Sequence, residues 1–261
     1  MKLNDTCDEQ CRTGELSRRA RERMPRSLFH AAWERAVFIH YAVEPAALQP
    51  YVPFPLDVRN GEAYASLVAF TLRRMRTGVC ERCSEWLLRP ISEHGFLNLR
   101  TYVRCGCETG IYFLAEWLSN RFAVPMGRPL FGLPYHFGKL DYHHDHESGC
   151  IRGEVTAGSG KLRYRADMDT SHEPIPSESG SLDEFLLERY TAFTQWPKLR
   201  RFFRVWHEPW PVRPLDITVE EGGLPNQIGP WFHEAQMIGA HYSRGVDPVW
   251  MGHPQIVHER L

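Results

Sequence analysis

Apolar and polar residues alternate without a break over residues 97–103. Successive side chains of an extended strand point to opposite faces, so this pattern predicts a strand with one apolar face and one polar face. The polar face carries Asn98, Arg100 and Tyr102. Two environments remain open for that face. It either lines an interior cavity, or it lies on the surface or forms a structural ion pair, for example between Arg100 and Glu116.

Further strands are predicted where apolar segments are bounded by turn residues, at 63–72, 111–117, 133–140 and 162–168. Two helices are predicted. A short one has Pro45 in its first turn, and a second begins at Ser181, with Glu184 completing a capping box and a buried stripe reaching Phe193. The chain from Trp231 is aromatic and reads as short strands. Many strands and few helices predict an α+β fold with a bent antiparallel β-sheet or barrel and peripheral helices.

The composition excludes several classes of protein. Hydrophobic residues make up 43% of the 261 residues and the formal net charge is −1, which favours a folded core over disorder. The neutral balance argues against a nucleic-acid partner. No stretch approaches the roughly 18 apolar residues that a membrane span needs, so we expect no membrane association.

The first 26 residues are polar and of mixed charge, and they contain a run of arginines. We predict a mobile or peripheral arm over residues 1–26, in which the arginine-rich part is either a short solvated helix or a contact for an acidic partner. Residues 27–261 are predicted to form a single domain. The arm lacks an apolar signal segment, and the seven cysteines are an odd number, so we expect reduced thiols and a cytoplasmic location.

Five sequence motifs occur in an order that becomes specific when they are taken together. They are residues 98–103, 110–113, 133–135, 185–190 with 207–210, and 241–246. In this order the chain resembles the uncharacterised DUF2071 family, also called YqjF-like, over roughly residues 28–252. The resemblance implies membership of the acetoacetate decarboxylase-like proteins. It therefore implies a strongly bent antiparallel sheet around a small-molecule cavity.

Two departures from the decarboxylase pattern affect the expected chemistry. Residues 127–134 resemble the stretch before the decarboxylase's catalytic lysine pair, but Tyr135 and His136 stand where the lysines are expected. Phe96 stands where a glutamate is expected in relatives, and the nearest upstream carboxylate is Glu93. Decarboxylation of a β-keto acid needs an electron sink, which an imine of lysine supplies and Tyr or His cannot. We therefore expect no acetoacetate decarboxylase activity.

The candidate site combines an anion anchor with groups that bind or transfer protons. Arg100 is the predicted anchor, because a guanidinium binds a carboxylate through two hydrogen bonds. His136 is the candidate for proton transfer, with a core histidine bonded to backbone as its alternative. Lys139 is either a relocated amine nucleophile or a surface lysine. The remaining predicted substrate-binding residues are Tyr102, Tyr112, Glu116 and Tyr135.

Two cysteine pairs offer a possible metal site. Cys80 and Cys83 have the spacing of a zinc knuckle, whereas Cys105 and Cys107 are too close in sequence for an unstrained chelate. The first pair could also be a redox pair, and ordinary thiols are the third alternative. We predict ordinary thiols, and no metal or other cofactor.

These observations predict a protein that binds a small organic acid or carbonyl compound in a barrel cavity, with turnover left open. The partner is thus a small-molecule carboxylate or carbonyl ligand, and a homo-oligomer is compatible with the sequence. One alternative is a non-catalytic ligand-binding or scaffold protein whose barrel is filled by aromatic side chains. A weaker alternative is a lyase that uses Lys139. An open cavity with convergent polar groups would favour the first function.

Overall fold

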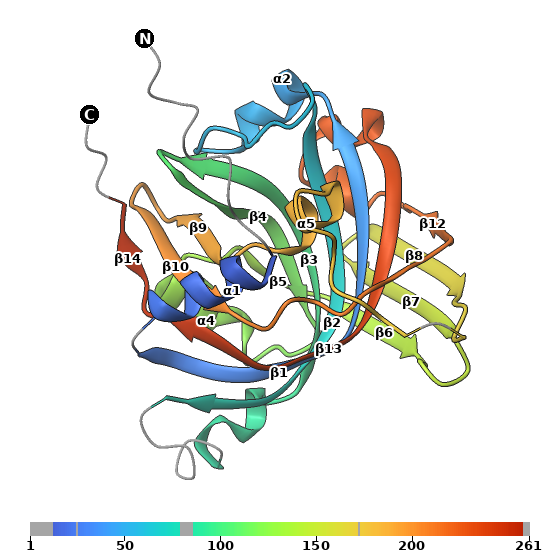
Figure 1. The fold of residues 1–261 in the computed structure, drawn as a ribbon, viewed down its shortest axis with the longest axis horizontal. Coiled ribbons are helices and arrows are strands. Elements are labelled where there is room, and N and C mark those ends of the chain that lie inside the picture. Colours follow the sequence, from blue (N-terminus) through green and yellow to red (C-terminus); the bar gives the residue numbers. More distant parts are fainter. Residues whose placement is uncertain (1–12, 25, 79–85, 172, 258–261) are drawn as a thin grey trace.

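The computed structural model describes residues 13–24, 26–78, 86–171 and 173–257. Within them a ten-stranded sheet and a four-stranded sheet form two layers (Figure 1). The large sheet contains β1 (Ser27–Val43), β2 (Ala63–Thr77), β3 (His94–Cys105), β4 (Glu108–Leu118), β5 (Tyr135–Phe137), β9 (Thr191–Gln195), β10 (Arg200–Trp206), β11 (Arg213–Pro214), β13 (Gln236–Gly252) and β14 (Gln255–Ile256). The small sheet contains β6 (Lys139–His144), β7 (Cys150–Ala157), β8 (Gly160–Asp167) and β12 (Ile217–Glu220).

The helices are short. The α-helices that lie wholly within the described residues include α1 (Thr13–Glu22), α2 (Pro45–Leu48), α4 (Val124–Phe131) and α5 (Leu182–Leu187). Single turns of 3₁₀-helix are η1 (Gln49–Tyr51), η2 (Arg89–Ile91), η3 (Pro225–Gln227) and η4 (Pro230–Glu234). None of the helices in the described residues is long and apolar enough to cross a membrane.

The large sheet closes on itself. Its order runs β13-β1-β2-β3-β4-β9-β10, and β10 pairs with β13 through Val205 with Met251 and Trp206 with Trp250. Seven strands thus form a ring, which we call the strand ring. Its pairings are antiparallel except between β4 and β9, and β5 also joins β4 in parallel. The strongly bent, mostly antiparallel sheet predicted from the sequence is confirmed.

Irregular positions in the long strands bend the sheet. The pairing of β1 with β2 shifts between Glu34 and Val37, where Arg35 has a positive φ of 56°. Opposite Glu34 on β13 lies Gly245, with a φ of 122°. A Cβ at Gly245 would lie 2.2 Å from the carbonyl oxygen of Trp33, so this position requires glycine.

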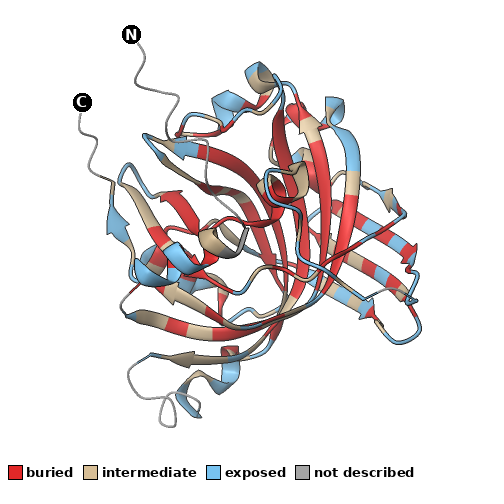
Figure 2. Cartoon of the chain, in the orientation of Figure 1, coloured by how far each residue is buried: buried red, intermediate tan, exposed pale blue. Residues whose placement is uncertain are grey.

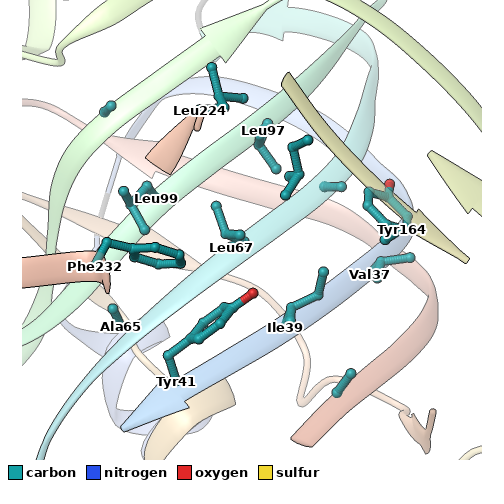
Figure 3. Close-up of a cluster of buried hydrophobic side chains, with 14 of the residues drawn as sticks. Val37, Ile39, Tyr41, Ala65, Leu67, Leu97, Leu99, Tyr164, Leu224 and Phe232 are labelled. Atoms are coloured by element: carbon teal, nitrogen blue, oxygen red, sulfur yellow. The ribbon is translucent and has the colours of Figure 1, made fainter. Parts of the chain in front are cut away.

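β3 is buried on both faces along most of its length (Figure 2). Leu97 and Leu99 belong to the outer cluster, between the ring and the small sheet, which also contains Val37 of β1 and Tyr164 of β8 (Figure 3). Phe96 and Tyr102 belong to the inner cluster, which gathers side chains from all seven strands of the ring. The predicted alternation of β3 therefore separates two cores.

Three of the five predicted strand segments fall within β2, β3 and β4, and a fourth, 162–168, coincides with β8 up to Asp167. The fifth, residues 133–140, is interrupted. Tyr135–Phe137 pairs with β4 in the ring, whereas Lys139 begins β6 in the small sheet. Gly138 lies between them, and a Cβ there would come within 3.3 Å of the Trp117 side chain, so a small residue lets the chain pass from one sheet to the other.

The helix predicted at Ser181 begins there, but it ends sooner than expected. The Ser181 hydroxyl accepts a hydrogen bond from the Glu184 amide at 3.0 Å. The predicted extension to Phe193 is wrong, because residues 191–195 form β9 between β4 and β10. The aromatic segment from Trp231 is also different from its prediction: η4 is followed by the 17-residue strand β13.

The arginine-rich part of the predicted arm is a helix, α1, and it packs on the ring. The Ser17 hydroxyl donates to the carbonyl of His207 at 2.8 Å, and Trp206 donates from Nε1 to the carbonyl of Ser17 at 3.0 Å. Arg21 lies over the rings of Trp206 and Trp250. The helix is therefore peripheral but not wholly solvated. The division of the chain at residue 26 remains a prediction.

Candidate ligand-binding cavity

A cavity of about 90 Å³ lies among the inner-face side chains of the strand ring, with α4 along one side. A space of about 15 Å³ already accommodates a water molecule, so this cavity has room for a small organic molecule. Most of its lining is aromatic or aliphatic. The polar side chains that line it are His94, Asn98, Arg100, Glu116, Tyr135, Arg189 and His207.

Strand pairing brings three of these polar groups into one row. Asn98 of β3 lies opposite Glu116 of β4, and Glu116 lies opposite Tyr135 of β5. Residues that are paired across neighbouring strands point to the same face of the sheet. The row therefore projects into the ring, one step along β3 from Arg100.

A bulge in β4 decides which of its residues face the cavity. Asn98 pairs with Glu116 but Arg100 pairs with Phe113, so the register shifts by one residue at Leu114. Strict alternation would have placed Tyr112 on the same face as Glu116. After the shift Tyr112 faces the outer cluster, where its ring centroid lies 5.9 Å from that of Phe54. The structure does not bring Tyr112 to the cavity.

Arg100 lines the cavity as a buried cation. Arg100 is 6% exposed. The Nη2 of its guanidinium donates to the carbonyl of Leu186 at 3.0 Å, whereas the Nε has no hydrogen-bond partner. No carboxylate of the described residues lies within 4 Å of its guanidinium nitrogens, so the alternative ion pair with Glu116 is not formed. The buried carboxyl of Glu188 lies near enough for Arg100 to lower its pKa, but it accepts hydrogen bonds from Tyr190 and Trp210, and burial raises that pKa to about 7. A buried guanidinium without a carboxylate in direct contact is costly, and it therefore attracts an anion.

Glu116, which pairs with Asn98 one step along β3 from Arg100, is a neutral acid in the same cavity. Its residue is 3% exposed, and its Oε2 has no hydrogen-bond partner. Burial raises the pKa of the Glu116 carboxyl well above its usual range, which favours the protonated form. Burial, together with Glu116, also raises the pKa of the Tyr135 hydroxyl, which stays a donor. The row can therefore donate hydrogen bonds from Glu116 and Tyr135, and Asn98 has a free acceptor in Oδ1.

Tyr102 lies on the same face as Arg100, but neighbouring groups use its hydroxyl. That hydroxyl donates to the carbonyl of Leu186 at 2.8 Å and lies 2.6 Å from the hydroxyl of Ser66. Arg100 donates to the same carbonyl. Because Leu186 belongs to α5, this helix holds the Arg100 side chain in place. Tyr102 thus has a positioning role in the structure.

His136 and Lys139 lie away from the cavity. His136 follows Tyr135 on β5, points to the opposite face and is exposed. Burial and the nearby Arg128 lower the pKa of its ring. Lys139 is exposed at the start of β6, in the small sheet. No lysine of the described residues lines the cavity.

Two histidines that line the cavity were not singled out from the sequence. Burial lowers the pKa of His94 and of His207 to about 4, so both are neutral at pH 7. Continuing the alternation of β3 from Phe96 towards its N-terminal end would have found His94. His207 stands in one of the family motifs, but it lies on no predicted element, so the direction of its ring could not be predicted.

The predicted cysteine sites are only partly within the described residues. Cys80 and Cys83 lie outside them. Cys105 ends β3 and Cys107 lies in the turn that leads to β4. The part of the chain that the structure describes contains no group of three or more His, Cys, Asp or Glu side chains able to hold a metal ion.

The burial of Glu116 makes stability depend on pH. The unfolded chain releases this proton near the ordinary carboxyl pKa of 4.5, whereas the folded protein retains it to higher pH. In that window the folded state binds more protons, so the free energy of unfolding falls as pH rises. As pH rises above about 5, wild type should therefore lose stability relative to Glu116→Gln, measured by urea unfolding at each pH. Parallel pH profiles for the two proteins would contradict a buried neutral acid.

Comparison with known families matches residues 30–247 to the model of DUF2071, described as an uncharacterized conserved protein. This stretch falls within the roughly 28–252 over which the sequence motifs indicated a resemblance. The uncharacterized protein YqjF of Bacillus subtilis (strain 168) is 26% identical over 226 residues, which are 84% of this chain and 89% of that protein.

Solved structures of similar fold share little sequence with this chain. An acetoacetate decarboxylase-like enzyme from Sphingomonas wittichii RW1 superposes with a TM-score of 0.64 at 16% identity, over 89% of this chain and 94% of that one. The enduracididine biosynthesis enzyme MppR, in complex with pyruvate, gives a TM-score of 0.62 at 14% identity, over 89% and 91% of the two chains. The acetoacetate decarboxylase-like fold expected from the motifs is confirmed.

Proposed function

Because this chain belongs to the DUF2071 family and encloses a cavity with a buried cation, we propose that it binds a small organic acid or carbonyl compound inside the strand ring. The observation that carries the proposal is Arg100, whose buried guanidinium lines the cavity without a carboxylate partner among the described residues. A carboxylate ligand would supply the missing counter-charge and two hydrogen-bond acceptors.

The polar row of Asn98, Glu116 and Tyr135 favours a ligand that carries a second oxygen-containing group, such as a carbonyl, besides its carboxylate. The protonated carboxyl of Glu116 and the hydroxyl of Tyr135 are donors suited to a carbonyl oxygen. The MppR enzyme of similar fold was solved with pyruvate, a small acid with both groups. That likeness is consistent with the proposal, which rests on this chain's own residues.

The residues that line the cavity favour a reaction that does not pass through an imine. The described lining contains no lysine, and Lys139 is exposed on the small sheet. Proton transfer inside the cavity would fall to Glu116 or His207, whose neutral forms are favoured by burial. His136 would need to act from outside the ring, so it is a weaker candidate than Glu116.

Aromatic packing inside the ring favours one second candidate, a scaffold with a filled lumen. The rings of Phe70 and Phe96 are parallel, with centroids 5.1 Å apart, and Trp33 lies 5.0 Å from Phe70. In this alternative the cavity is a packing defect that takes no ligand.

Thermal-shift and calorimetric measurements with wild type separate the two candidates. Small acids such as pyruvate and butanoate should raise the melting temperature, and the matched amides pyruvamide and butanamide should not. A ligand at a hundred times its dissociation constant adds about 2.7 kcal/mol to the free energy of unfolding. If no acid stabilises the protein, the ligand-binding proposal falls and the scaffold candidate takes its place.

A further inference from the structure

The inner face of β3 forms a ladder that changes in character from one end to the other. Arg100, Asn98, Phe96 and His94 follow each other at every second residue, paired with Ser66, Val68, Phe70 and Leu72 of β2. Each step is about 6.6 Å along the strand, so the ladder spans about 20 Å. It begins with a cation, passes the row of Asn98 and Glu116, and then becomes aromatic and aliphatic.

Methionines reach the surface beyond the apolar part of this ladder. Met126 of α4 lines the cavity and is 37% exposed, while Met75 and Met251 line it and are half-buried. Met251 pairs with Phe29, and Phe29 pairs with Thr77, two residues after Met75. Met75 and Met251 therefore lie at the same end of the ring. Methionine side chains are flexible and adapt to apolar groups of different shape.

The apolar end of the cavity also lacks, among the described residues, a free cationic side chain that could bind a second carboxylate. Among the described residues that line the cavity, the arginines are Arg100 and Arg189, and the guanidinium of Arg189 is paired with Asp57 at 2.8 Å. His94 is neutral at pH 7, because burial lowers its pKa to about 4. A dicarboxylate would therefore place its second charge against aromatic rings without a counter-ion.

We infer that the ligand is an amphipathic monocarboxylate, with its carboxylate on Arg100 and an aliphatic or aromatic body that runs along Phe96 and Phe70 towards the three methionines. The inference rests on the proposed function and adds the chemical class of the ligand. It predicts that the methionine end, which we call the mouth, is where the body of the ligand leaves the cavity.

A series of straight-chain acids tests the ligand class by calorimetry on the full-length protein. From acetate to hexanoate, affinity should rise about four-fold for each added methylene group, because each buries apolar surface. Succinate should bind at least ten-fold more weakly than butanoate, its match in chain length, and 1-hexanol should bind much more weakly than hexanoate.

Variants at the mouth test the direction of the ligand body. Met126→Glu should weaken dodecanoate at least ten-fold and leave acetate within two-fold of wild type, because only the long chain reaches the mouth from Arg100. Met126→Leu keeps an apolar side chain and should behave like wild type. The partial exposure of Met126 allows both variants to fold.

The outcomes separate this inference from the function on which it rests. Acids that bind with no dependence on chain length would overturn the inference and leave the proposed function standing. Equal weakening of acetate and dodecanoate by Met126→Glu would overturn the position of the mouth. If neither acetate nor pyruvate binds wild type, the proposed function itself has failed, and the inference fails with it.

Discussion

Arg100→Met is expected to abolish carboxylate binding and to leave the folded protein at least as stable as wild type. The guanidinium is the buried cation of the cavity, and removing one partner of a buried charge pair costs about 2–5 kcal/mol of binding free energy, which is a factor of about 30 or more. Without ligand, the same group is a buried charge that lacks a carboxylate partner, so its loss removes a desolvation cost. Tyr102 still donates to the carbonyl of Leu186, which therefore keeps a partner.

Two further variants make this result specific. Arg100→Lys keeps the charge and loses the paired hydrogen bonds, so binding should weaken by about 1–3 kcal/mol. Arg163→Met, on the exposed face of the small sheet, should change carboxylate affinity little. Calorimetry with pyruvate and urea unfolding measure the two quantities. Unchanged affinity in Arg100→Met would rule out this residue as the anchor.

Asp57→Ala should cause the largest loss of stability, about 3–5 kcal/mol. The side chains of Asp57 and Arg189 are 4% and 5% exposed, and the carboxylate accepts from Arg189 at 2.8 Å and from Arg104 at 3.0 Å. Removing the carboxylate leaves the Arg189 guanidinium buried without its counter-charge. Urea unfolding measures the loss directly.

A surface pair and a double variant are the controls for Asp57. Glu154→Ala removes an exposed partner of Arg163, and it should cost far less than Asp57→Ala. Combining Asp57→Ala with Arg189→Met removes both charges and should restore at least half of the lost stability, because no unpaired ion is left behind. A double variant as unstable as Asp57→Ala would show that the loss comes from packing and not from charge.

The sequence predicts the local elements better than their contacts. The alternation of residues 97–103 was enough to assign Arg100 and Asn98 to one face of β3. The alternation could not locate the bulge at Leu114, because an extra residue leaves no mark in the apolar pattern. Tyr112 was therefore predicted to face the cavity, whereas it faces the outer cluster. The helix at Ser181 was recognised from its cap, whereas its end was missed because pairing of Phe193 with β4 overrides the helical spacing.

The environment of Arg100 shows why the site itself was harder to predict than its strand. Its carbonyl partner, Leu186, is 86 residues away in sequence, and α5 follows only after the chain has passed through β6, β7 and β8 of the small sheet. The raised pKa of Glu116 likewise depends on burial by several strands. Such properties arise from tertiary structure, so no local pattern encodes them.

The closure of the strand ring by β10 and β13 has a dynamic consequence. This seam rests on the pairing of Val205 with Met251 and of Trp206 with Trp250, whereas β1 and β13 pair along almost their whole length. Local opening is cheapest where few backbone hydrogen bonds must break, so the amide hydrogens of the seam should exchange with solvent sooner than those of β1. The helix α1 holds the seam, since Arg21 lies over the rings of Trp206 and Trp250. The helix α1, at the edge of the fold, thus stabilises the closure of the ring that surrounds the cavity.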